Sequence, residues 1–175
     1  MKQELNKIKA FLFDVDGVFT DGGLLADLNG EFYRTFDSKD GFAVRMAVMH
    51  GYKVGIITGG RSESIKKRFL ACGFKKEDIY LNARNKILDF EDFCTRHSLK
   101  PEDVLYMGDD MPDIPVMLAC GCGVAPADAV EQVLEIADYV CKKPGGRGCV
   151  RECLEMTMKA SGEWYLDVQV YEKKF

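Results

Sequence analysis

The stretch from Ala10 to Gly22, AFLFDVDGVFTDG, constrains the fold of this 175-residue chain more than any other. Its first four residues are all apolar, a pattern typical of a buried β-strand. Two carboxylates, Asp14 and Asp16, follow directly and stand one residue apart. Side chains two positions apart on an extended chain point to the same side. One carboxylate is therefore placed to attack an electrophile while the other moves a proton, and a hard cation such as Mg²⁺ would relieve their repulsion.

A solvated acidic turn has the same Asp-x-Asp pattern, so the remaining chain must decide between the two interpretations. Short apolar runs alternate with helical patterns, which predicts an α/β fold with a doubly wound parallel sheet covered on both faces. The strands are expected at 10–13, 52–59, 79–81, 104–108, 122–125 and 139–141. The helices are expected at 41–50, 62–72, 86–97, 111–118 and 127–136, with a final helix after the glycine turn at 145–148.

Polar residues gather where three of the predicted strands end. These residues are Asp14, Asp16, Thr58, Gly59, Asp109 and Asp110. Parallel strands place their carboxyl ends at one edge of the sheet, and ligands bind at that edge in folds of this kind. The sequence therefore predicts that acids, a hydroxyl group and glycines meet at one site.

A β-hairpin is predicted soon after the first strand. The pair Asn29-Gly30 is a strong signal for a hairpin turn, and it lies between the apolar segments 24–25 and 32–36. We expect this hairpin to form a two-stranded flap, at about residues 22–37, that projects beyond the sheet.

The end of the chain, about residues 161–175, carries a different pattern. Apolar and polar residues alternate from Trp164 to Tyr171, so this tail is expected either to pair as a strand or to lie against a neighbouring subunit. Repeats and linkers are absent from the sequence, so residues 1–175 are expected to form a single domain.

Composition excludes several classes of protein. The net charge is −4 and the sequence has no dense basic cluster, which disfavours binding to nucleic acids. No apolar run approaches the roughly 20 residues that span a bilayer, and the N-terminus lacks a signal-peptide pattern, so we expect a cytoplasmic protein without a membrane association. The seven cysteines form no CxxC pair and the chain has two histidines, which predicts reduced, partly buried thiols in place of a zinc site.

Four segments together resemble the signature motifs of the haloacid dehalogenase superfamily. They are FDVDGVFTDG, IITGG, Lys86 and GDDMPD, and they occur in the order found in that family. The resemblance covers about Phe11 to Arg151 and implies a Rossmann-like magnesium-dependent phosphatase that works through an aspartyl-phosphate. Alone, Lys86 would fit a solvated helix lysine, and Asp110 and Asp113 would fit acids at a helix N-terminus.

The resemblance also assigns roles to individual residues. It implies that Asp14 is the nucleophile and Asp16 the general acid and base, and that Asp14, Asp16 and Asp109 bind the metal. It further implies phosphate binding by Thr58, Gly59 and Lys86, with Asp110 and Asp113 oriented around the metal. The chemistry agrees, because a phosphate dianion repels an attacking carboxylate unless the site supplies positive charge.

Larger members of the superfamily carry a cap domain that covers the substrate. Here 41 residues separate Asp16 from Thr58 and 27 separate Thr58 from Lys86, so neither gap can hold a cap. In capless relatives an adjacent subunit of a tetramer covers the site, and the resemblance therefore implies a homotetramer.

Finer features resemble phosphatases of this superfamily that act on the 8-phosphate of an eight-carbon sugar acid used in lipopolysaccharide biosynthesis. The resembling pieces include Gly145 to Gly148, whose Arg147 has no assigned role. The implied substrate-binding residues are Asp37, Ser38, Lys39, Asp40, Gly41, Arg45, Arg61 and Arg68. Arginine grips carboxylates well, although Arg68 fits an ordinary surface charge equally. Gly60 displaces Arg61 by one position relative to the family, which leaves open a nine-carbon sugar acid 9-phosphate as the substrate.

Two alternatives belong to another functional class. A phospho-receiver domain also gathers acids, a threonine and a lysine at a sheet edge, but its acid pair is adjacent in sequence, whereas the first acids here are spaced Asp-x-Asp. A non-enzymatic scaffold subunit would have no need of both Asp14 and Asp16.

Overall fold

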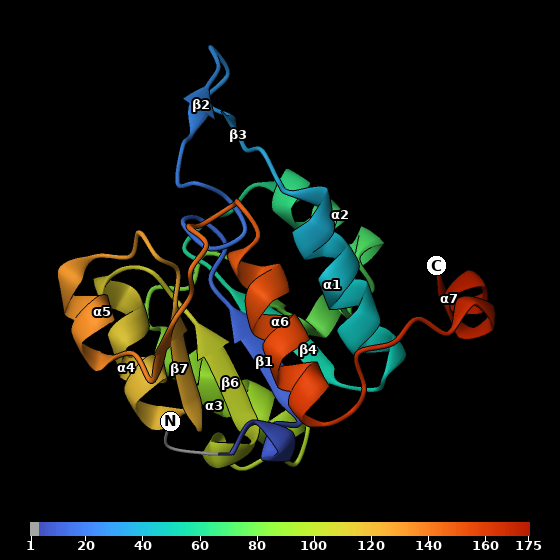
Figure 1. Cartoon of the computed structure of the whole chain (residues 1–175). Coiled ribbons are helices and arrows are strands. Elements are labelled where there is room, and N and C mark those ends of the chain that lie inside the picture. Colours follow the sequence, from blue (N-terminus) through green and yellow to red (C-terminus); the bar gives the residue numbers. More distant parts are fainter. Residues whose placement is uncertain (1–3) are drawn as a thin grey trace.

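The computed structural model describes residues 4–175 and contains a six-stranded parallel sheet (Figure 1). The strands lie in the order β5-β4-β1-β6-β7-β8. Their bounds are Ala10–Phe13 (β1), Lys53–Ile57 (β4), Ile79–Tyr80 (β5), Val104–Met107 (β6), Cys122–Ala125 (β7) and Tyr139–Val140 (β8). The predicted α/β fold with a parallel sheet is confirmed.

Strand β1 lies at the centre of the sheet, between β4 and β6. Phe13 pairs in register with Ile56 on one side and Met107 on the other. All four residues of β1 and of β6 are buried, because helices cover both faces of the sheet. The three strands therefore end together, and the residues that follow them come to one edge.

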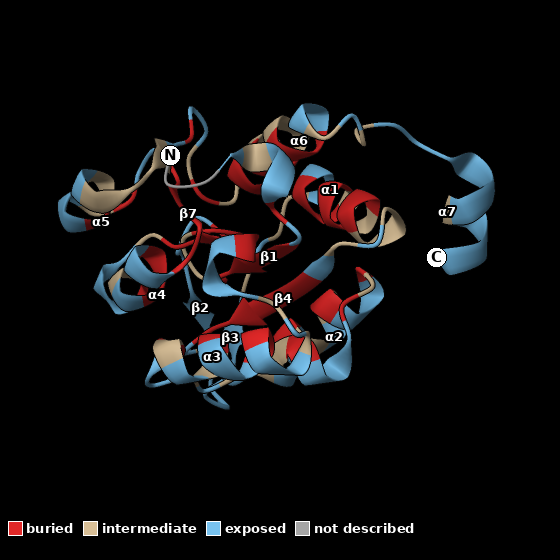
Figure 2. Ribbon diagram, turned by 90° about the horizontal axis from the view of Figure 1, so that it is seen from below, coloured by how far each residue is buried: buried red, intermediate tan, exposed pale blue. Residues whose placement is uncertain are grey.

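Helices cover both faces of this sheet. Figure 2 shows α1 (Ser38–Met49) and α6 (Cys149–Ala160) on one side of β1 and β4, and α3 (Lys86–Arg96) on the other. Two core clusters result: α1, α6 and the apolar side of α2 (Glu63–Ala71) form one, and α3, α4 (Ile114–Ala119) and α5 (Glu131–Ile136) form the other.

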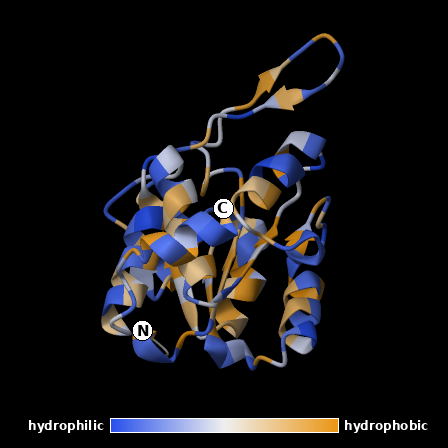
Figure 3. Cartoon of the chain, turned by 90° about the vertical axis from the view of Figure 1, so that its right-hand side faces the viewer, coloured by the Kyte–Doolittle hydropathy of each residue, from blue (hydrophilic) through white to orange (hydrophobic). Residues whose placement is uncertain are grey.

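The predicted flap is present. Strands β2 (Leu25–Ala26) and β3 (Phe32–Tyr33) pair antiparallel and project beyond the edge of the sheet where β1 ends (Figures 1 and 3). Between β1 and β4 the chain holds this hairpin and α1, so the fold has no cap domain there.

The tail differs from the prediction of a strand. It forms a short helix, α7 (Val168–Lys174), which Asp167 caps by accepting a hydrogen bond from the amide of Val170. Lys174 donates to the carbonyl oxygen of Val48, so α7 lies against α1. The alternating pattern was misleading because the helix is short. A capping aspartate followed by two apolar side chains in one or two helical turns fits the two-residue period of a strand nearly as well as a true strand does.

Other differences concern element ends. Helix α1 begins three residues earlier than predicted because Asp37 caps it, and α5 begins at Glu131, four residues later than predicted, because a turn follows Pro126. The predicted helix at 111–118 begins with a 3₁₀ turn at Met111–Asp113.

The state of the cysteines and the polarity of the helices can be compared with what the composition predicted. All seven cysteines are free of disulfides in the described part of the chain, as predicted, and all are buried, whereas partial burial was predicted. Across residues 4–175, every helix is too short or too polar to cross a bilayer.

Asp40 joins the starts of α1 and α6. Its carboxylate is fully buried and accepts hydrogen bonds from the amides of Arg151 at 2.7 Å and Gly148 at 3.2 Å.

Replacing Asp40 with alanine leaves both amides without partners and should lower the free energy of unfolding by about 3 kcal/mol. Denaturant titration measures this loss. The control Asp37→Ala removes only a helix cap and should cost about 1 kcal/mol; equal losses would contradict the role of Asp40.

Candidate active site

The ends of β1, β4 and β6 surround a cavity of about 480 Å³. The side chains that line it include six predicted site residues, namely Asp14, Asp16, Thr58, Lys86, Asp109 and Asp113. Gly59 and Asp110 also line the cavity. The structure therefore brings together every residue that the resemblance assigned to catalysis, metal binding or phosphate binding.

Lys86 lies between two carboxylates. Its Nζ atom is 3.0 Å from Oδ2 of Asp14 and 2.7 Å from Oδ1 of Asp113, and its side chain is 6% exposed. Burial alone would lower the pKa of Lys86, but the charges of Asp14 and Asp113 outweigh that effect and raise it. The amine stays protonated and supplies a fixed positive charge inside the cavity.

Three carboxylates in this cavity fit a metal ion. Oxygens of Asp14, Asp109 and Asp113 lie within 4.8 Å of one another. Oδ1 of Asp14 and Oδ1 of Asp109 are buried and have no hydrogen-bond partner among residues 4–175. Such oxygens are the ligands that hard divalent cations prefer, and a bound cation would satisfy both.

The electrostatics of these acids agree with a cation site. Desolvation, with the nearby charge of Asp113, raises the pKa of Asp14 to about 7. Desolvation, with the charges of Asp14 and Asp113, raises the pKa of Asp109 to about 8. The negative charge is therefore costly without a counter-ion, and a divalent cation would return both groups to their ionised form.

Asp113 is the member of this group whose oxygens already have partners. Oδ1 accepts from the hydroxyl of Tyr106 at 2.6 Å and from Lys86, and Oδ2 accepts from the amides of Asp109 at 3.0 Å and Asp110 at 3.2 Å. Asp113 therefore orients the lysine and the 109–110 backbone. Sequence reasoning missed Tyr106, although a tyrosine within a buried strand needs a partner for its hydroxyl.

Asp16 is bound by a residue that sequence reasoning also missed. Arg34 donates from Nε to Oδ1 of Asp16 at 2.6 Å and from Nη2 to Oδ2 at 2.8 Å. The Arg34 side chain is 4% exposed, and it also donates to Ser62 at the start of α2. Arg34 follows the flap, 18 residues beyond Asp16, and no local pattern in the sequence marks this pairing.

Thr58 and the glycines shape the cavity wall. The Thr58 side chain is buried, and its hydroxyl oxygen accepts from the amide of Gly60 at 3.1 Å, which leaves the hydroxyl proton available for a ligand. Gly17 has φ of +88°, and a Cβ there would lie 1.9 Å from Oδ2 of Asp109. Only glycine at this position lets the loop after β1 approach the carboxylate.

Two arginines predicted to bind substrate lie outside the cavity. Arg45 donates to the carbonyl oxygen of Ala71 and to the hydroxyl of Tyr171. The guanidinium of Arg68 lies over the ring of Phe36, 5.5 Å from its centroid. In this chain both arginines serve packing between helices, because their long side chains reach partners that their sequence positions do not reveal.

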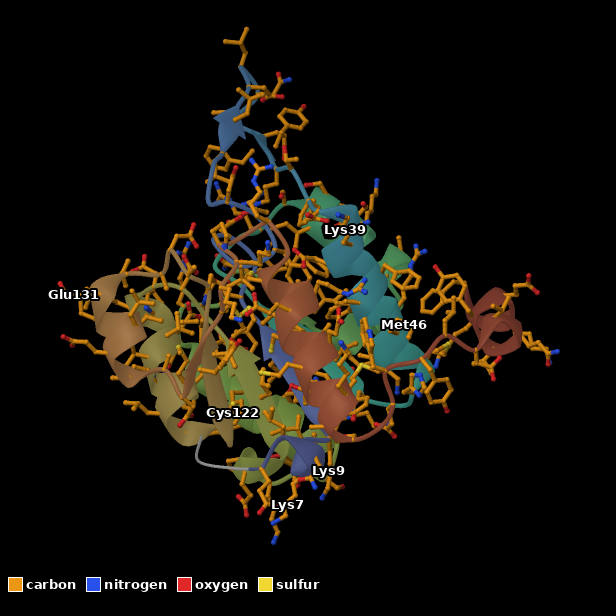
Figure 4. All side chains as sticks on the ribbon, in the orientation of Figure 1. Lys7, Lys9, Lys39, Met46, Cys122 and Glu131 are labelled. Atoms are coloured by element: carbon orange, nitrogen blue, oxygen red, sulfur yellow. The ribbon has the colours of Figure 1, made fainter. Side chains whose placement is uncertain are left out.

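The segment 37–41 also lies apart from the acids. Asp37 accepts from the amide of Lys39 as the cap of α1, and with Lys39 it lines a separate cleft that also includes Arg147. Lys39 lies at the end of α1 nearest the flap (Figure 4). Asp40 has the buried role described above, Gly41 packs against Arg68, and Ser38 begins the helix. Of the predicted substrate-binding residues, Arg61 lines a cavity next to the acids.

Comparison with known proteins identifies the family. The family model for haloacid dehalogenase-like hydrolases matches residues 43–151. The chain belongs to the haloacid dehalogenase-like hydrolases. Among curated hydrolases of this kind, the 3-deoxy-D-manno-octulosonate 8-phosphate phosphatase KdsC of Escherichia coli is 37% identical over 156 residues, which cover 89% of this chain and 82% of that protein.

Solved hydrolase structures agree with this. The cobalt-bound deoxy-D-mannose-octulosonate 8-phosphate phosphatase (YrbI) from Haemophilus influenzae has a TM-score of 0.89 at 32% identity, with 98% of this chain and 99% of that chain covered. The Moraxella catarrhalis phosphatase, in complex with magnesium, phosphate and KDO, has a TM-score of 0.87 at 28% identity, with 91% of each chain covered. The family and these relatives show that this hydrolase is a phosphatase.

The raised pKa values predict how a metal stabilises this hydrolase. The folded pKa values of about 7 for Asp14 and about 8 for Asp109 lie above the ordinary pKa of an aspartate, 3.8, so the metal-free folded state binds more protons than the unfolded chain. Stability without metal should therefore fall as the pH rises from about 5 to about 8. Mg²⁺ binds the deprotonated acids, so the rise in melting temperature that it causes should grow over the same range.

Thermal unfolding in chelator and in excess Mg²⁺, at pH values from about 5 to about 8, measures both effects. The variant Asp109→Asn removes one of the two titrating acids and one metal ligand, so its Mg²⁺ shift should be smaller and depend less on pH. A Mg²⁺ shift of equal size at every pH in the unmodified protein would contradict the prediction.

Proposed function

We propose that this phosphatase is a magnesium-dependent enzyme that removes the phosphate from 3-deoxy-D-manno-octulosonate 8-phosphate, a step in lipopolysaccharide precursor synthesis. One observation carries the proposal: Asp14, Lys86 and Asp109 converge in one cavity of a chain that is 37% identical to a phosphatase named for this substrate. The alternatives of a phospho-receiver and a scaffold subunit are not retained, because the relatives are phosphatases.

The metal would be held by Asp14 and Asp109, with the backbone carbonyl of Asp16 as a further oxygen ligand. When bound, Mg²⁺ neutralises charge on the phosphoryl oxygens and so lets a carboxylate approach them. Lys86 supplies the second positive charge, and the Thr58 hydroxyl and Gly59 amide donate hydrogen bonds without adding charge.

The chemistry then proceeds in two steps on this chain's own residues. A carboxylate oxygen of Asp14 attacks phosphorus, the P–O bond to the sugar breaks, and protonated Asp16 gives its proton to the leaving alkoxide. In the second step Asp16 takes a proton from water, the water oxygen attacks the aspartyl-phosphate, and inorganic phosphate leaves with Asp14 restored.

The open cavity needs a cover that excludes water. The flap exposes the apolar residues Leu25, Leu28 and Tyr33, and no cap formed by residues 4–175 lies over the site. We propose that an adjacent subunit of a cytoplasmic homotetramer supplies the cover, as in capless relatives. A monomer that is fully active at nanomolar concentration would contradict this proposal.

The assignment of Asp14 as nucleophile has a direct test. Asp14→Asn removes the attacking oxygen anion and should reduce Mg²⁺-dependent phosphate release by about 10⁴-fold or more. Release of inorganic phosphate from the sugar-acid phosphate measures the loss. Glu91→Gln, a surface change on α3 outside the cavity, is the matched control and should keep full activity. Substantial turnover by Asp14→Asn would exclude the mechanism.

The chain length of the substrate is tested separately. Because Gly60 shifts Arg61 by one position, a nine-carbon keto sugar acid 9-phosphate is the second candidate substrate. The ratio of kcat/KM values for the eight- and nine-carbon substrates decides between them, and equal values would remove the preference for eight carbons.

Arg34 is expected to position Asp16 for proton transfer. Arg34→Met removes both hydrogen bonds to Asp16 and should lower kcat/KM for the sugar-acid phosphate by about 100-fold. p-Nitrophenyl phosphate has a leaving group that departs without protonation, so its kcat/KM should fall far less. The kcat/KM values report the first step in both cases. Equal losses on the two substrates would show a general structural effect, and Arg34→Lys should recover part of the activity.

A further inference from the structure

A second and larger cavity adjoins the active site. It has a volume of about 790 Å³ and lies between the flap and the start of α2. It shares Asp16, Gly59, Gly60 and Arg84 with the cavity that holds the acids. Its volume falls within the roughly 300–1,000 Å³ that is usual for small-molecule sites. A group attached to a phosphate at Asp14 would extend past Asp16 into this flap cleft.

Three arginines line the flap cleft, and they differ in how they are paired. Arg34 is held by both oxygens of Asp16. Arg61 and Arg84, in contrast, are exposed and form no hydrogen bond, ion pair or ring contact within residues 4–175. Two guanidinium groups therefore face a small-molecule cleft without a partner.

The acidic residues of the cleft leave these two charges uncompensated. Asp16 forms an ion pair with Arg34, and Glu63 forms one with Lys66 at 3.7 Å. Glu31 is the remaining acid of the cleft, against two unpaired arginines. The unpaired charges of Arg61 and Arg84 therefore give the flap cleft an excess of positive charge, which suits an anionic group.

Arg84 has the position that matters most. It lies in the loop between β5 and α3, two residues before Lys86, and it is the charged residue besides Asp16 that lines both cavities. Leu24 and Phe32 of the flap are 47% and 42% exposed and line the same cleft, so they offer an apolar wall to a carbon chain. Sequence reasoning did not select Arg84.

We propose that Arg84, together with Arg61, binds the carboxylate of the substrate in the flap cleft and so selects sugar-acid phosphates over neutral sugar phosphates. This inference rests on the proposed function, which supplies a substrate with one anionic group besides the phosphate. Guanidinium groups bind carboxylates through paired hydrogen bonds that a hydroxyl group cannot replace. Arg34 stays with Asp16 and takes no part in this contact.

The test compares two substrates in the full-length protein with Mg²⁺. Arg84→Met should lower kcat/KM for 3-deoxy-D-manno-octulosonate 8-phosphate by about 10- to 100-fold, mainly through KM, and change kcat/KM for glucose 6-phosphate by less than about twofold. Arg61→Met should act in the same direction. Lys67→Met, which removes an exposed cation of α2 outside the cleft, is the matched control and should alter neither value.

Inhibition by the two products gives a readout that does not depend on turnover of the sugar-acid phosphate. Arg84→Met should weaken inhibition by the free sugar acid by a similar factor and leave inhibition by inorganic phosphate unchanged. Equal losses for both substrates, or weaker inhibition by phosphate, would assign Arg84 to the phosphoryl group and overturn the inference. Unchanged values for the sugar acid would overturn it as well.

The outcome for the proposed function is separate. An unmodified protein that shows no preference for the sugar-acid phosphate over glucose 6-phosphate would refute the proposed substrate, and with it this inference. A preference in the unmodified protein that persists in Arg84→Met would refute the inference alone.

Discussion

The concentration of buried negative charge at the end of the central strand is the constraint on which the structure depends. Oxygens of Asp14, Asp109 and Asp113 lie within 4.8 Å of one another, and Asp14 and Asp113 share a single ammonium group, that of Lys86. One positive charge cannot balance three carboxylates in a desolvated cavity, which is why the pKa values of Asp14 and Asp109 are raised and why two oxygens are left without partners. This excess of negative charge is unfavourable when no counter-ion is bound, and it makes the site suited to a divalent cation that can in turn bind a phosphoryl group.

The flap connects this charged centre to the wall of the neighbouring cleft. Arg34 follows the hairpin, binds Asp16 through two hydrogen bonds and reaches Ser62 at the start of α2. Its guanidinium therefore fixes the acid and one wall of the cleft together. Arg34 therefore connects the exposed hairpin to Asp16 and to the start of α2.

The sheet was predictable because its strands are buried on both faces and read as continuous apolar runs bounded by turns. The structure of the tail and the ends of α1 and α5 were harder to predict from the sequence. There the outcome depends on single capping or turn residues, Asp37, Pro126 and Asp167, whose effect competes with the periodicity of the apolar residues around them. The helix α7 also depends on contact with α1, which is distant in sequence.

By itself the sequence determined the fold class and the chemical centre, since Asp14, Asp16, Thr58 and Asp109 leave neighbouring parallel strands at one edge, and strand order places them together. Only the tertiary structure showed that Tyr106 and Asp113 orient Lys86, that Arg34 binds Asp16, and that Arg45, Arg68 and Asp40 serve packing. The reason is physical: the direction of a backbone follows from local pattern, whereas the partner of a long or buried polar side chain depends on which distant segment packs within its reach.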